Sequence, residues 1–402
     1  MTDLPTPADL QAARELLDGV AVLTPMEESR WLSAMAGGPV SLKCENLQRT
    51  GSFKARGAYV RMARLSEAER ANGVVAASAG NHAQGVALAA QMLGIKATVF
   101  MPEGAPIPKE KATRGYGADV VFHGRYLEHA LVRAREFAAE TGAILIHPFD
   151  HADIVAGQAS CGLEILEQAP DLQTVLVPTG GGGLLAGIAL AVKEHHPHVR
   201  VVGVQAKGAA AFPASLAQGS PAALESMQTM ADGIAVGVPG DVTFRAVQEY
   251  VDDIVTVSEE SLSRALLALL ERAKMVVEPA GAAAVAALLE QPTAYRTPVV
   301  AVLSGGNIDP LLLGKVIRHG LAAAGRYLHL SVCIPDTPGG LARLLVELAS
   351  AQANVLEVMH ERISPTLNLD EVEVQVQLET RGEQHAERVL GRLREHGYRV
   401  SE

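Results

Sequence analysis

The segment TVLVPTGGGG at residues 174–183 decides the fold, because a short apolar run passes directly into four consecutive glycines. The apolar run predicts a buried strand, and the Ala- and Leu-rich residues 184–195 that follow predict a helix. A strand, a loop and a helix in this order are typical of a βαβ unit in a parallel sheet. Glycine amides at the start of a helix bind anions, so the segment also predicts an anion site.

The same alternation of strand and helix recurs along most of the chain and predicts a doubly wound α/β fold. The other predicted strands are residues 74–77, 97–101, 119–122, 144–146, 199–204 and 299–303, and the other predicted helices are residues 81–93, 108–116, 126–141 and 155–167. Ligands of such sheets bind beyond the carboxyl ends of the strands. Two polar loops, residues 78–82 and 304–307, directly follow predicted strands, so we expect them at this edge.

Composition restricts the class of protein. The chain has 402 residues, of which 48% are hydrophobic and 4% aromatic, which fits two or three domains of helices packed on parallel sheets. The formal charge of -11 argues against nucleic acid or an anionic membrane as a partner. Cys44, Cys161 and Cys333 are far apart and form no CxxC pair, which indicates a reducing compartment and no structural zinc. With no signal-peptide pattern at the start of the sequence, we expect a cytoplasmic protein.

Several ligands could be bound by the glycine loop. A P-loop would continue with Gly-Lys-Ser/Thr, but Gly183 is followed by two leucines. A dinucleotide fingerprint is nearly matched by Gly181, Gly183 and Ala186, but it requires an acidic residue where Gln205 stands. A phosphate monoester remains as the predicted ligand. The alternative is that the glycines form only a tight turn.

Lys54 is the candidate reactive residue. It lies in the segment SFKARGA at residues 52–58, after the polar turn of residues 46–51, and we expect a helix to begin near residues 50–52 and to continue through Met62. The positive end of a helix and partial burial both lower the pKa of a lysine, toward the neutral amine that a Schiff base requires. A solvated surface lysine is the alternative interpretation.

The two polar loops also have simpler interpretations. Residues 78–82 present backbone amides and the Asn81 side chain at the start of a predicted helix, where an N-cap alone would explain the sequence. His82 by itself is a satisfied or solvated histidine. Residues 304–307 could be a turn at the end of a strand. The functional interpretation depends on the four motifs occurring together.

The pattern changes after about Gly325. The remaining predicted elements are a strand at residues 327–334, a helix at 341–353, strands at 355–363 and 371–378, a helix at 384–395 and a short strand at 398–400. This βαββαβ order is typical of a ferredoxin-like module. We therefore divide the chain into residues 1–325, with a smaller subdomain at about 45–150, and residues 326–402, joined at 322–326.

Together the four motifs resemble the threonine ammonia-lyases (threonine dehydratases) among the fold-type II pyridoxal-phosphate enzymes, which also include serine racemase. The resemblance covers about residues 15–325. It implies a fold like that of the tryptophan synthase β chain, with two parallel-sheet subdomains and pyridoxal 5'-phosphate as cofactor. The implied cofactor-binding residues are Phe53, Lys54, Asn81, Gly180, Gly181, Gly182, Gly183, Leu184, Glu278 and Ser304. The implied substrate-binding residues are Ser78, Ala79, Gly80 and His82.

The resemblance also implies individual roles. Lys54 forms the Schiff base with the cofactor and then acts as the general base. Asn81 donates to the phenolic oxygen of the cofactor, residues 180–184 hold its phosphate, and Ser304 faces its pyridine nitrogen. Phe53 and Glu278 lie beside the cofactor ring.

The implied reaction is β-elimination of water from L-threonine, with L-serine as a second substrate. The implied assembly is a homodimer or homotetramer. The chain differs from serine racemases of this type at Ala79, where the racemases carry a second serine. They also carry acidic metal ligands at the positions of Gln205 and Ala211, so we expect no divalent metal site. A dehydratase of serine or 3-hydroxyaspartate, a serine racemase-like enzyme and a non-enzymatic amino-acid-binding regulator remain as alternatives.

The C-terminal module resembles an ACT domain, a regulatory unit that often binds amino acids. The matching residues, which the resemblance implies to be effector-binding, are Asp336, Pro338, Gly339 and Asn354. The implied effector is an amino acid such as isoleucine or valine. The alternative is a module that only mediates assembly.

Overall fold

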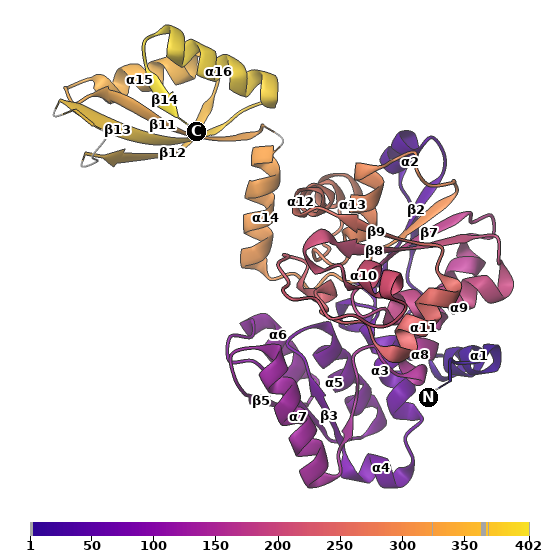
Figure 1. The fold of residues 1–402 in the computed structure, drawn as a ribbon. Coiled ribbons are helices and arrows are strands. Elements are labelled where there is room, and N and C mark those ends of the chain that lie inside the picture. Colours follow the sequence, from indigo (N-terminus) through magenta and orange to yellow (C-terminus); the bar gives the residue numbers. More distant parts are fainter. Residues whose placement is uncertain (1–2, 324, 363–366, 369, 402) are drawn as a thin grey trace. The chain divides into compact units, whose positions relative to one another are not determined.

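A computed structural model of the chain describes residues 3–323, 325–362, 367–368 and 370–401. It consists of two compact units, Met1–Pro310 and Leu311–Glu402 (Figure 1). The domain boundary that we proposed from the sequence, between residues 325 and 326, lies shortly after α14 (Pro310–Ala323), a helix that almost wholly belongs to the second unit. Residue 324 of the expected join lies outside the described residues.

The first unit contains a sheet of six strands in the order β1-β2-β10-β7-β8-β9. These strands are β1 (Met26–Glu28), β2 (Val40–Lys43), β10 (Val299–Val302), β7 (Thr174–Pro178), β8 (Arg200–Ala206) and β9 (Asp253–Val257). All neighbours are parallel except β1 and β2. Every residue of β7 and β10 is buried, which explains their unbroken apolar sequences, because both faces of a parallel sheet are covered by helices.

A second parallel sheet, of four strands in the order β5-β4-β3-β6, lies within the same unit (Figure 1). Its strands are β3 (Val74–Ala77), β4 (Ala97–Met101), β5 (Asp119–Phe122) and β6 (Ile144–Leu145). The predicted α/β fold with two parallel sheets is therefore confirmed. The prediction omitted β1, β2 and β9, because strands at or near the edge of a sheet are less uniformly apolar than central ones.

Four helices position the polar loops: α3 (Lys54–Ala63), α5 (Asn81–Leu93), α8 (Ala152–Gln168) and α9 (Gly183–His195). α3 and α8 approach so closely that a Cβ on Gly157 would lie 2.6 Å from the Cα of Gly57. α8 and α9 are equally close, since a Cβ on Gly187 would lie 2.6 Å from the amide nitrogen of Ala159. Because glycine has no side chain at these contacts, α3 packs closely against α8, and α8 packs closely against α9.

The remaining helices of the first unit complete the layers around the two sheets. They are α1 (Pro7–Leu16), α2 (Arg30–Ala36), α4 (Glu67–Asn72), α6 (Ile107–Gly115), α7 (Leu127–Thr141), α10 (Ala211–Gln218), α11 (Asp241–Tyr250), α12 (Glu259–Ala268) and α13 (Ala283–Glu290), together with the single turns η1 (Glu45–Leu47), η2 (Arg49–Gly51), η3 (Lys207–Ala209), η4 (Asp232–Ile234) and η5 (Leu269–Ala273). Among the helices that the structure describes, none is long and apolar enough to cross a membrane.

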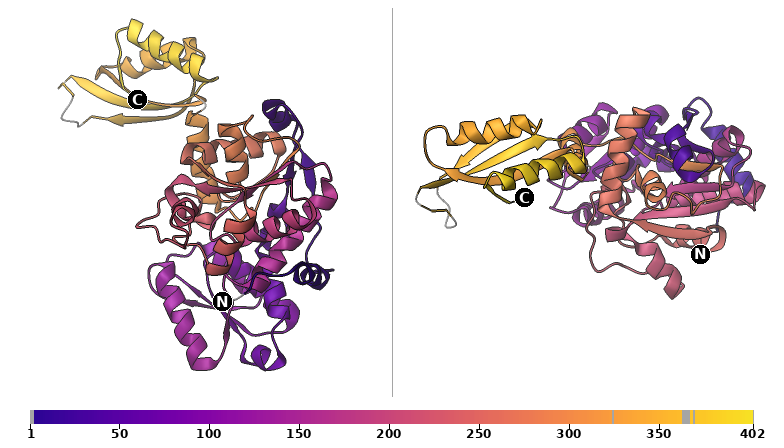
Figure 2. Two further views of the ribbon diagram at one scale, coloured as in Figure 1. Left: turned by 45° about the vertical axis from the view of Figure 1, so that its right-hand side comes forward. Right: turned by 90° about the horizontal axis from the view of Figure 1, so that it is seen from above.

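The second unit ends in a sheet of four strands in the order β12-β13-β11-β14. Its elements are β11 (Tyr327–Pro335), α15 (Gly340–Ser350), β12 (Asn354–Glu361), β13 (Glu371–Glu379), α16 (Glu383–Glu395) and β14 (Arg399–Ser401). The chain order is βαββαβ, as predicted, and both helices cover one face of the sheet (Figures 1 and 2). Residue 363, the predicted end of the second strand, lies outside the described residues. The alternating apolar residues of β11 and β13 form the core beneath the two helices.

Candidate active site

Lys54 is the first residue of α3, directly after a bridge that joins two distant segments. Ser52 pairs with Gly305, and the amide of Phe53 donates to the carbonyl of Ser304 at 3.2 Å. Ser52 is extended and the helix begins at Lys54, later than the predicted start near residues 50–52. The strand-end loop after β10 thus fixes the first turn of α3.

The side chain of Lys54 is partly buried. Its Nζ donates to the carbonyl oxygen of Pro148 at 2.8 Å and lies 5.1 Å from the centre of the Phe53 ring. Burial lowers the pKa of Lys54 to about 8, although the carboxyl group of Glu278 opposes the shift. At neutral pH a larger fraction of this lysine is therefore the neutral amine than is the case for an exposed lysine.

A buried cluster of charges holds α3 in place two residues beyond Lys54. The Arg56 guanidinium contacts Glu45 at 2.8 Å and Glu164 at 2.6 Å, and Lys43 also reaches Glu164 at 2.6 Å. Lys43, Glu45 and Arg56 have no exposed surface. Burial opposes ionisation of Glu45, but the Arg56 guanidinium outweighs it and holds the pKa of Glu45 below its usual value. The cluster joins β2, η1, α3 and α8.

Asn81, Glu278 and Asn307 form a chain of side-chain hydrogen bonds. Asn81 donates through Nδ2 to Oε1 of Glu278 at 2.6 Å and accepts through Oδ1 from Nδ2 of Asn307 at 2.8 Å. Burial and the negative charge of Asp232 raise the pKa of Glu278 to about 7. The positive charge of Lys109 and the hydrogen bond from Asn81 act in the opposite direction. Glu278 is therefore only partly ionised at neutral pH.

The loop after β10 contacts this chain through its backbone. The amide of Glu278 donates to the carbonyl of Gly305 at 3.0 Å, and Ser304 is 3% exposed. A Cβ on Gly305 would lie 2.3 Å from Oε1 of Glu278, so only glycine leaves room for the carboxyl group. The loop thereby connects Lys54 with Glu278, as shown by its bonds to both segments.

The glycine loop of residues 180–183 joins β7 to α9, which begins at Gly183. Gly182 has a φ of +93°, and a Cβ on Gly181 would lie 2.4 Å from the Phe149 ring. In the part of the chain that the structure describes, the buried amides of Gly181, Gly182, Gly183 and Leu184 have no protein acceptor. Buried amides without an acceptor are costly, so the loop is built for an external one.

Ser78, Ala79 and Gly80 are partly accessible and lead into the first turn of α5. The hydroxyl of Ser78 accepts from the amide of Gly80 at 3.1 Å. The His82 imidazole lies in the interior, where its Nε2 is 2.8 Å from the carbonyl oxygen of Ile146, and burial lowers the pKa of His82 to about 3. The backbone of this loop, rather than the His82 ring, faces the accessible side.

The sequence of the chain is similar to those of known enzymes. Residues 19–305 match the family described as "Pyridoxal-phosphate dependent enzyme". The chain belongs to this family. The chain is 45% identical to an L-threonine ammonia-lyase of Thermotoga maritima, over 98% of each chain.

Two solved structures are also similar to this pyridoxal-phosphate-dependent enzyme. A threonine deaminase from T.th. is 45% identical with a TM-score of 0.73, covering 76% of this chain and 99% of that one. A maize serine racemase is 33% identical with a TM-score of 0.75, covering 80% of this chain and 99% of the racemase.

The residues present fit pyridoxal 5'-phosphate. The free amides of the glycine loop suit its phosphate, and the amine of Lys54 suits its aldehyde. Gly305 and Gly181 leave space that a Cβ would fill. Of the predicted cofactor-binding residues, Phe53, Lys54, Asn81, Glu278 and Ser304 are brought together by the bridge and hydrogen bonds described above, and the glycine loop contacts the Phe149 ring next to Pro148.

The described residues contain no group of three His, Cys, Asp or Glu side chains that could hold a metal ion. Of the two positions compared with racemase metal sites, Gln205 is buried and its Oε1 accepts from the amide of Phe212 at 3.0 Å. Ala211 is the first residue of α10.

The implied effector residues do not meet within one C-terminal module. Asp336 follows β11, and its carboxylate accepts from Arg362 at 3.2 Å, while Gly339 with a φ of +83° precedes α15. Asn354 starts β12 beside Glu379, at the end of the sheet where β11 begins. The antiparallel register thus separates Asn354 from Asp336, Pro338 and Gly339 by the length of β11.

Sequence reasoning did not identify several residues of the site. Pro148 contributes only a carbonyl oxygen and Phe149 only a ring that covers the glycine loop, and both lie in the loop between β6 and α8. Lys109 lies 4.0 Å from the position of a Cβ on Gly80 and forms a 2.9 Å ion pair with Asp232. None of these carries a local sequence signal. Asn307 belonged to a predicted polar loop but had no assigned contact.

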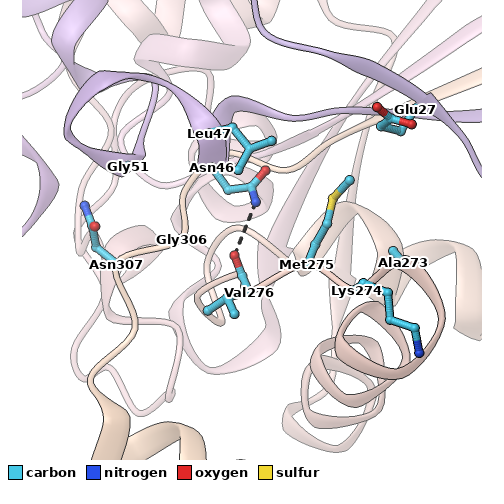
Figure 3. A pocket seen from close by; sticks show the side chains of 10 residues that line it. All are labelled: Glu27, Asn46, Leu47, Gly51, Ala273, Lys274, Met275, Val276, Gly306 and Asn307. Carbon is cyan, nitrogen blue, oxygen red and sulfur yellow. Dashed lines mark hydrogen bonds between the residues drawn. The ribbon is translucent and has the colours of Figure 1, made fainter.

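A cavity of about 640 Å³ borders the same loops (Figure 3). It is lined by Glu27, Asn46, Leu47, Gly51, Ala273, Lys274, Met275, Val276, Gly306 and Asn307. Asn46 donates to the carbonyl of Val276 at 3.2 Å in its wall. Asn307 belongs both to this cavity and to the hydrogen-bonded chain of Asn81, whereas Lys54 does not line the cavity.

Proposed function

We propose that the chain is an L-threonine ammonia-lyase, which converts L-threonine to 2-oxobutanoate and ammonia. One observation carries the proposal: a partly buried lysine with a lowered pKa belongs to the same site as a glycine loop whose amides have no acceptor among the residues that the structure describes. The similarity to L-threonine ammonia-lyase over nearly the whole chain supports the choice of threonine among amino-acid substrates.

Pyridoxal 5'-phosphate, when bound, supplies an aldehyde that condenses with amines and a ring that accepts negative charge from Cα of an amino acid. Lys54 would hold the aldehyde and, once displaced by the amine of the substrate, would remove the α-proton through its neutral Nζ. The pKa of about 8 makes this proton transfer feasible near neutral pH. The Pro148 carbonyl, which accepts from Nζ at 2.8 Å, aims the amine.

The substrate carboxylate would bind at the loop of residues 78–81. In the described chain, the amides of Asn81 and His82 in the first turn of α5 have no protein acceptor. The start of a helix also carries positive partial charge, which favours a carboxylate. We assign His82 to this loop through its backbone, because its ring bonds to the Ile146 carbonyl.

Asn81, Glu278 and Ser304 would surround the cofactor ring. Asn81 has a second amide proton available for the phenolic oxygen of the cofactor, because only one is used on Glu278. Ser304 is neutral and would leave the pyridine nitrogen unprotonated. Phe53 and Leu184 would pack beside the ring and the phosphate.

Two competing activities are testable alternatives. Elimination from L-serine or 3-hydroxyaspartate requires the same catalytic groups, and the similarity to maize serine racemase raises racemisation as a second outcome. Ala79 favours elimination, because its methyl group cannot deliver a proton to the opposite face of the substrate. A regulator without chemistry would lack any need for a lysine of lowered pKa.

The decisive experiment is an assay of the purified protein loaded with pyridoxal 5'-phosphate. We expect visible absorbance from the attached cofactor and 2-oxobutanoate from L-threonine, faster than pyruvate from L-serine and with little D-serine. Negligible turnover of threonine would refute the proposal, and a colourless protein would refute the cofactor site. Lys96→Ala is the matched control for Lys54→Ala, because Lys96 is largely exposed on the same sheet subdomain.

We further propose that the C-terminal module regulates the enzyme by binding an amino acid such as isoleucine or valine at the turn of Asp336, Pro338 and Gly339, without Asn354, which lies at the other end of β11. The T.th. threonine deaminase, matched over 99% of its length by 76% of this chain, suggests that the catalytic part can be studied alone. Isoleucine titration of the full chain and of residues 1–325 is the test. Equal responses would refute the regulatory role.

We also propose that the enzyme is a cytoplasmic homodimer or homotetramer. The three cysteines are free in the structure, which suits a reducing compartment. Light scattering of the purified enzyme tests the assembly, and a monomeric mass would refute it. Fractionation of cells with an antibody tests the location.

A further inference from the structure

We propose that Asn307 is a positioning residue, which fixes the orientation of the Asn81 carboxamide and so directs the Asn81 NH2 group to Glu278 and the cofactor. The proposal rests on the cofactor site proposed above. Asn307 does not contact the cofactor in this proposal. It acts through Asn81.

The orientation of a carboxamide depends on its hydrogen bonds, because its oxygen and nitrogen have similar shapes. Oδ1 of Asn81 accepts from Nδ2 of Asn307 at 2.8 Å, and Nδ2 of Asn81 donates to Oε1 of Glu278 at 2.6 Å. Rotating Asn81 by half a turn would place two donors against each other on the Asn307 side. It would also place an oxygen against the ionised Glu278 carboxylate. The observed orientation is therefore favoured on both sides.

The orientation of Asn307 is fixed in turn by the backbone. Its Nδ2 also donates to the carbonyl oxygen of Thr50 at 2.6 Å, so both protons of the amide group are used. Rotating Asn307 would place its oxygen against two acceptors, the carbonyl of Thr50 and Oδ1 of Asn81. A main-chain carbonyl neither titrates nor rotates, which makes Thr50 a fixed reference for both carboxamides.

The backbone around Thr50 is shaped to allow this contact. Thr50 has a φ of +63°, a left-handed conformation that costs energy for a residue with a branched side chain. Gly51 follows it, and a Cβ there would lie 2.5 Å from Oδ1 of Asn307. The amide of Gly306 donates to the carbonyl of Gly51 at 2.9 Å and holds the two segments together. Figure 3 shows the Asn307 side chain beside Gly51, at the end of the cavity away from Lys274.

The proposal predicts an unusual order of effects. Asn307→Asp is nearly isosteric, but an aspartate has only acceptors and would face the Thr50 carbonyl and Oδ1 of Asn81. It would favour the rotated Asn81, whose oxygen then points at Glu278 and the cofactor. Asn307→Ala only removes a donor and leaves space that opens to the cavity. A packing role predicts the reverse order, in which the isosteric aspartate is the milder change.

The test measures cofactor affinity and the pH titration of the visible absorption band in both variants. We expect about tenfold weaker cofactor binding in Asn307→Ala, the loss expected for one oriented hydrogen bond, and a further loss of about tenfold in Asn307→Asp. The midpoint of the band titration should shift in Asn307→Asp. In an Asn81→Ala background the difference in cofactor affinity between the two changes at residue 307 should become small, because the residue through which they act on the cofactor is missing.

Asn46→Asp is the matched control. Asn46 lines the same cavity and bonds to the Val276 carbonyl, but it makes no contact with Asn81 among the described hydrogen bonds. It should leave the band titration unchanged, while thermal melting reports any general loss of stability. An Asn307→Asp protein that binds the cofactor within twofold of the unmodified protein would overturn the proposal. So would aspartate being milder than alanine. Absence of a visible band in the unmodified enzyme would instead refute the proposed function.

Discussion

The glycine loop of residues 180–183 and the side-chain cluster around Lys54 would bind the two ends of the cofactor by different means. The loop uses backbone amides from one short segment, to which Thr243 donates a hydrogen bond at the Gly181 carbonyl, and neighbouring residues such as Phe149 must leave room for it. The cluster uses side chains from α3, α5 and the segments before α13 and α14, and two of its groups titrate near neutral pH. Cofactor binding at the loop should therefore be weakened by added side-chain volume. Cofactor binding and turnover at the cluster should be weakened by loss of a side-chain group or by a change in its protonation.

The largest effect is expected at the side-chain cluster. Lys54→Ala removes both the amine that holds the cofactor and the proposed general base, so turnover of threonine should fall by roughly a thousandfold or more. The glycine loop is intact in this variant, so the phosphate should still bind and the protein should retain weak, noncovalent affinity for the cofactor. Keto-acid release and equilibrium dialysis measure the two quantities. Near-normal turnover would exclude Lys54, and Lys96→Ala should behave like the unmodified enzyme.

Cofactor binding by the glycine loop should be weakened by a single added methyl group. Gly181→Ala would place a Cβ 2.4 Å from the Phe149 ring, and the resulting shift of the loop should weaken cofactor binding by roughly 10- to 100-fold. Absorbance titration with the cofactor gives the affinity. Gly115→Ala is the control, because a Cβ there would meet nothing within 4 Å. If Gly181→Ala bound the cofactor normally, the phosphate would have to lie elsewhere.

The pH dependence of the two ends should differ. Attachment of the cofactor to the apoprotein requires neutral Lys54, so its rate should rise about tenfold per pH unit up to about pH 8 and then level off. Glu278→Gln removes the carboxylate that stabilises the ammonium form, so the pKa of Lys54 should fall further and the profile should move to lower pH. Stopped-flow absorbance follows the attachment, with Glu103→Gln as a control. A shift toward higher pH would contradict the electrostatic assignment.

An analogue that keeps only the phosphate ester, without the ring and the aldehyde, separates the phosphate end from Lys54 and Glu278. Backbone amides do not titrate, and a phosphate monoester is fully ionised above its second pKa of about 6. Binding of the analogue should therefore be nearly constant between about pH 7 and 9. A steep pH dependence in this range would show that a titrating side chain, rather than the glycine loop alone, holds the phosphate.

The smallest effect is expected at the ion pair between Lys109 and Asp232 near Gly80. The pair is partly exposed, with 60% exposure of the Asp232 side chain, so each charge should change the KM for threonine by no more than about fivefold. Lys109→Gln should raise KM and Asp232→Asn should lower it, because the substrate carboxylate is attracted by one and repelled by the other. Steady-state assays at low and high salt test this, and salt should reduce both effects. If both variants changed KM in the same direction, the ion pair would act by holding the loop in place and not by its charges.

The sequence predicted those parts of the site that a local pattern encodes. The strand-loop-helix order placed residues 78–82, 180–183 and 304–307 at strand ends, and the structure has β3, β7 and β10 there. It did not predict the contacts between distant segments, such as Pro148 with Lys54 or Gly305 with Glu278, because the chain order contains no signal for which loops meet. The helix of Lys54 starts later than predicted, because Ser52 is extended to pair with Gly305. In the C-terminal module, the strand pattern was predicted but not the register that separates Asn354 from Asp336.

The buried charges beneath α3 restrict how this sequence can change over generations. A mutation that removes Arg56 alone leaves Glu45 without its guanidinium partner and Glu164 with Lys43 alone, at a cost of about 3–5 kcal/mol. Replacing all four side chains by apolar ones of similar volume can be neutral or even favourable, but it requires simultaneous changes at positions 43, 45, 56 and 164. A mutational path that removes one charge at a time passes through interiors in which a buried charge lacks its partner, and these are less stable. Descendants of a protein with this buried ionic cluster therefore tend to retain the cluster, and with it the position of the helix that carries Lys54.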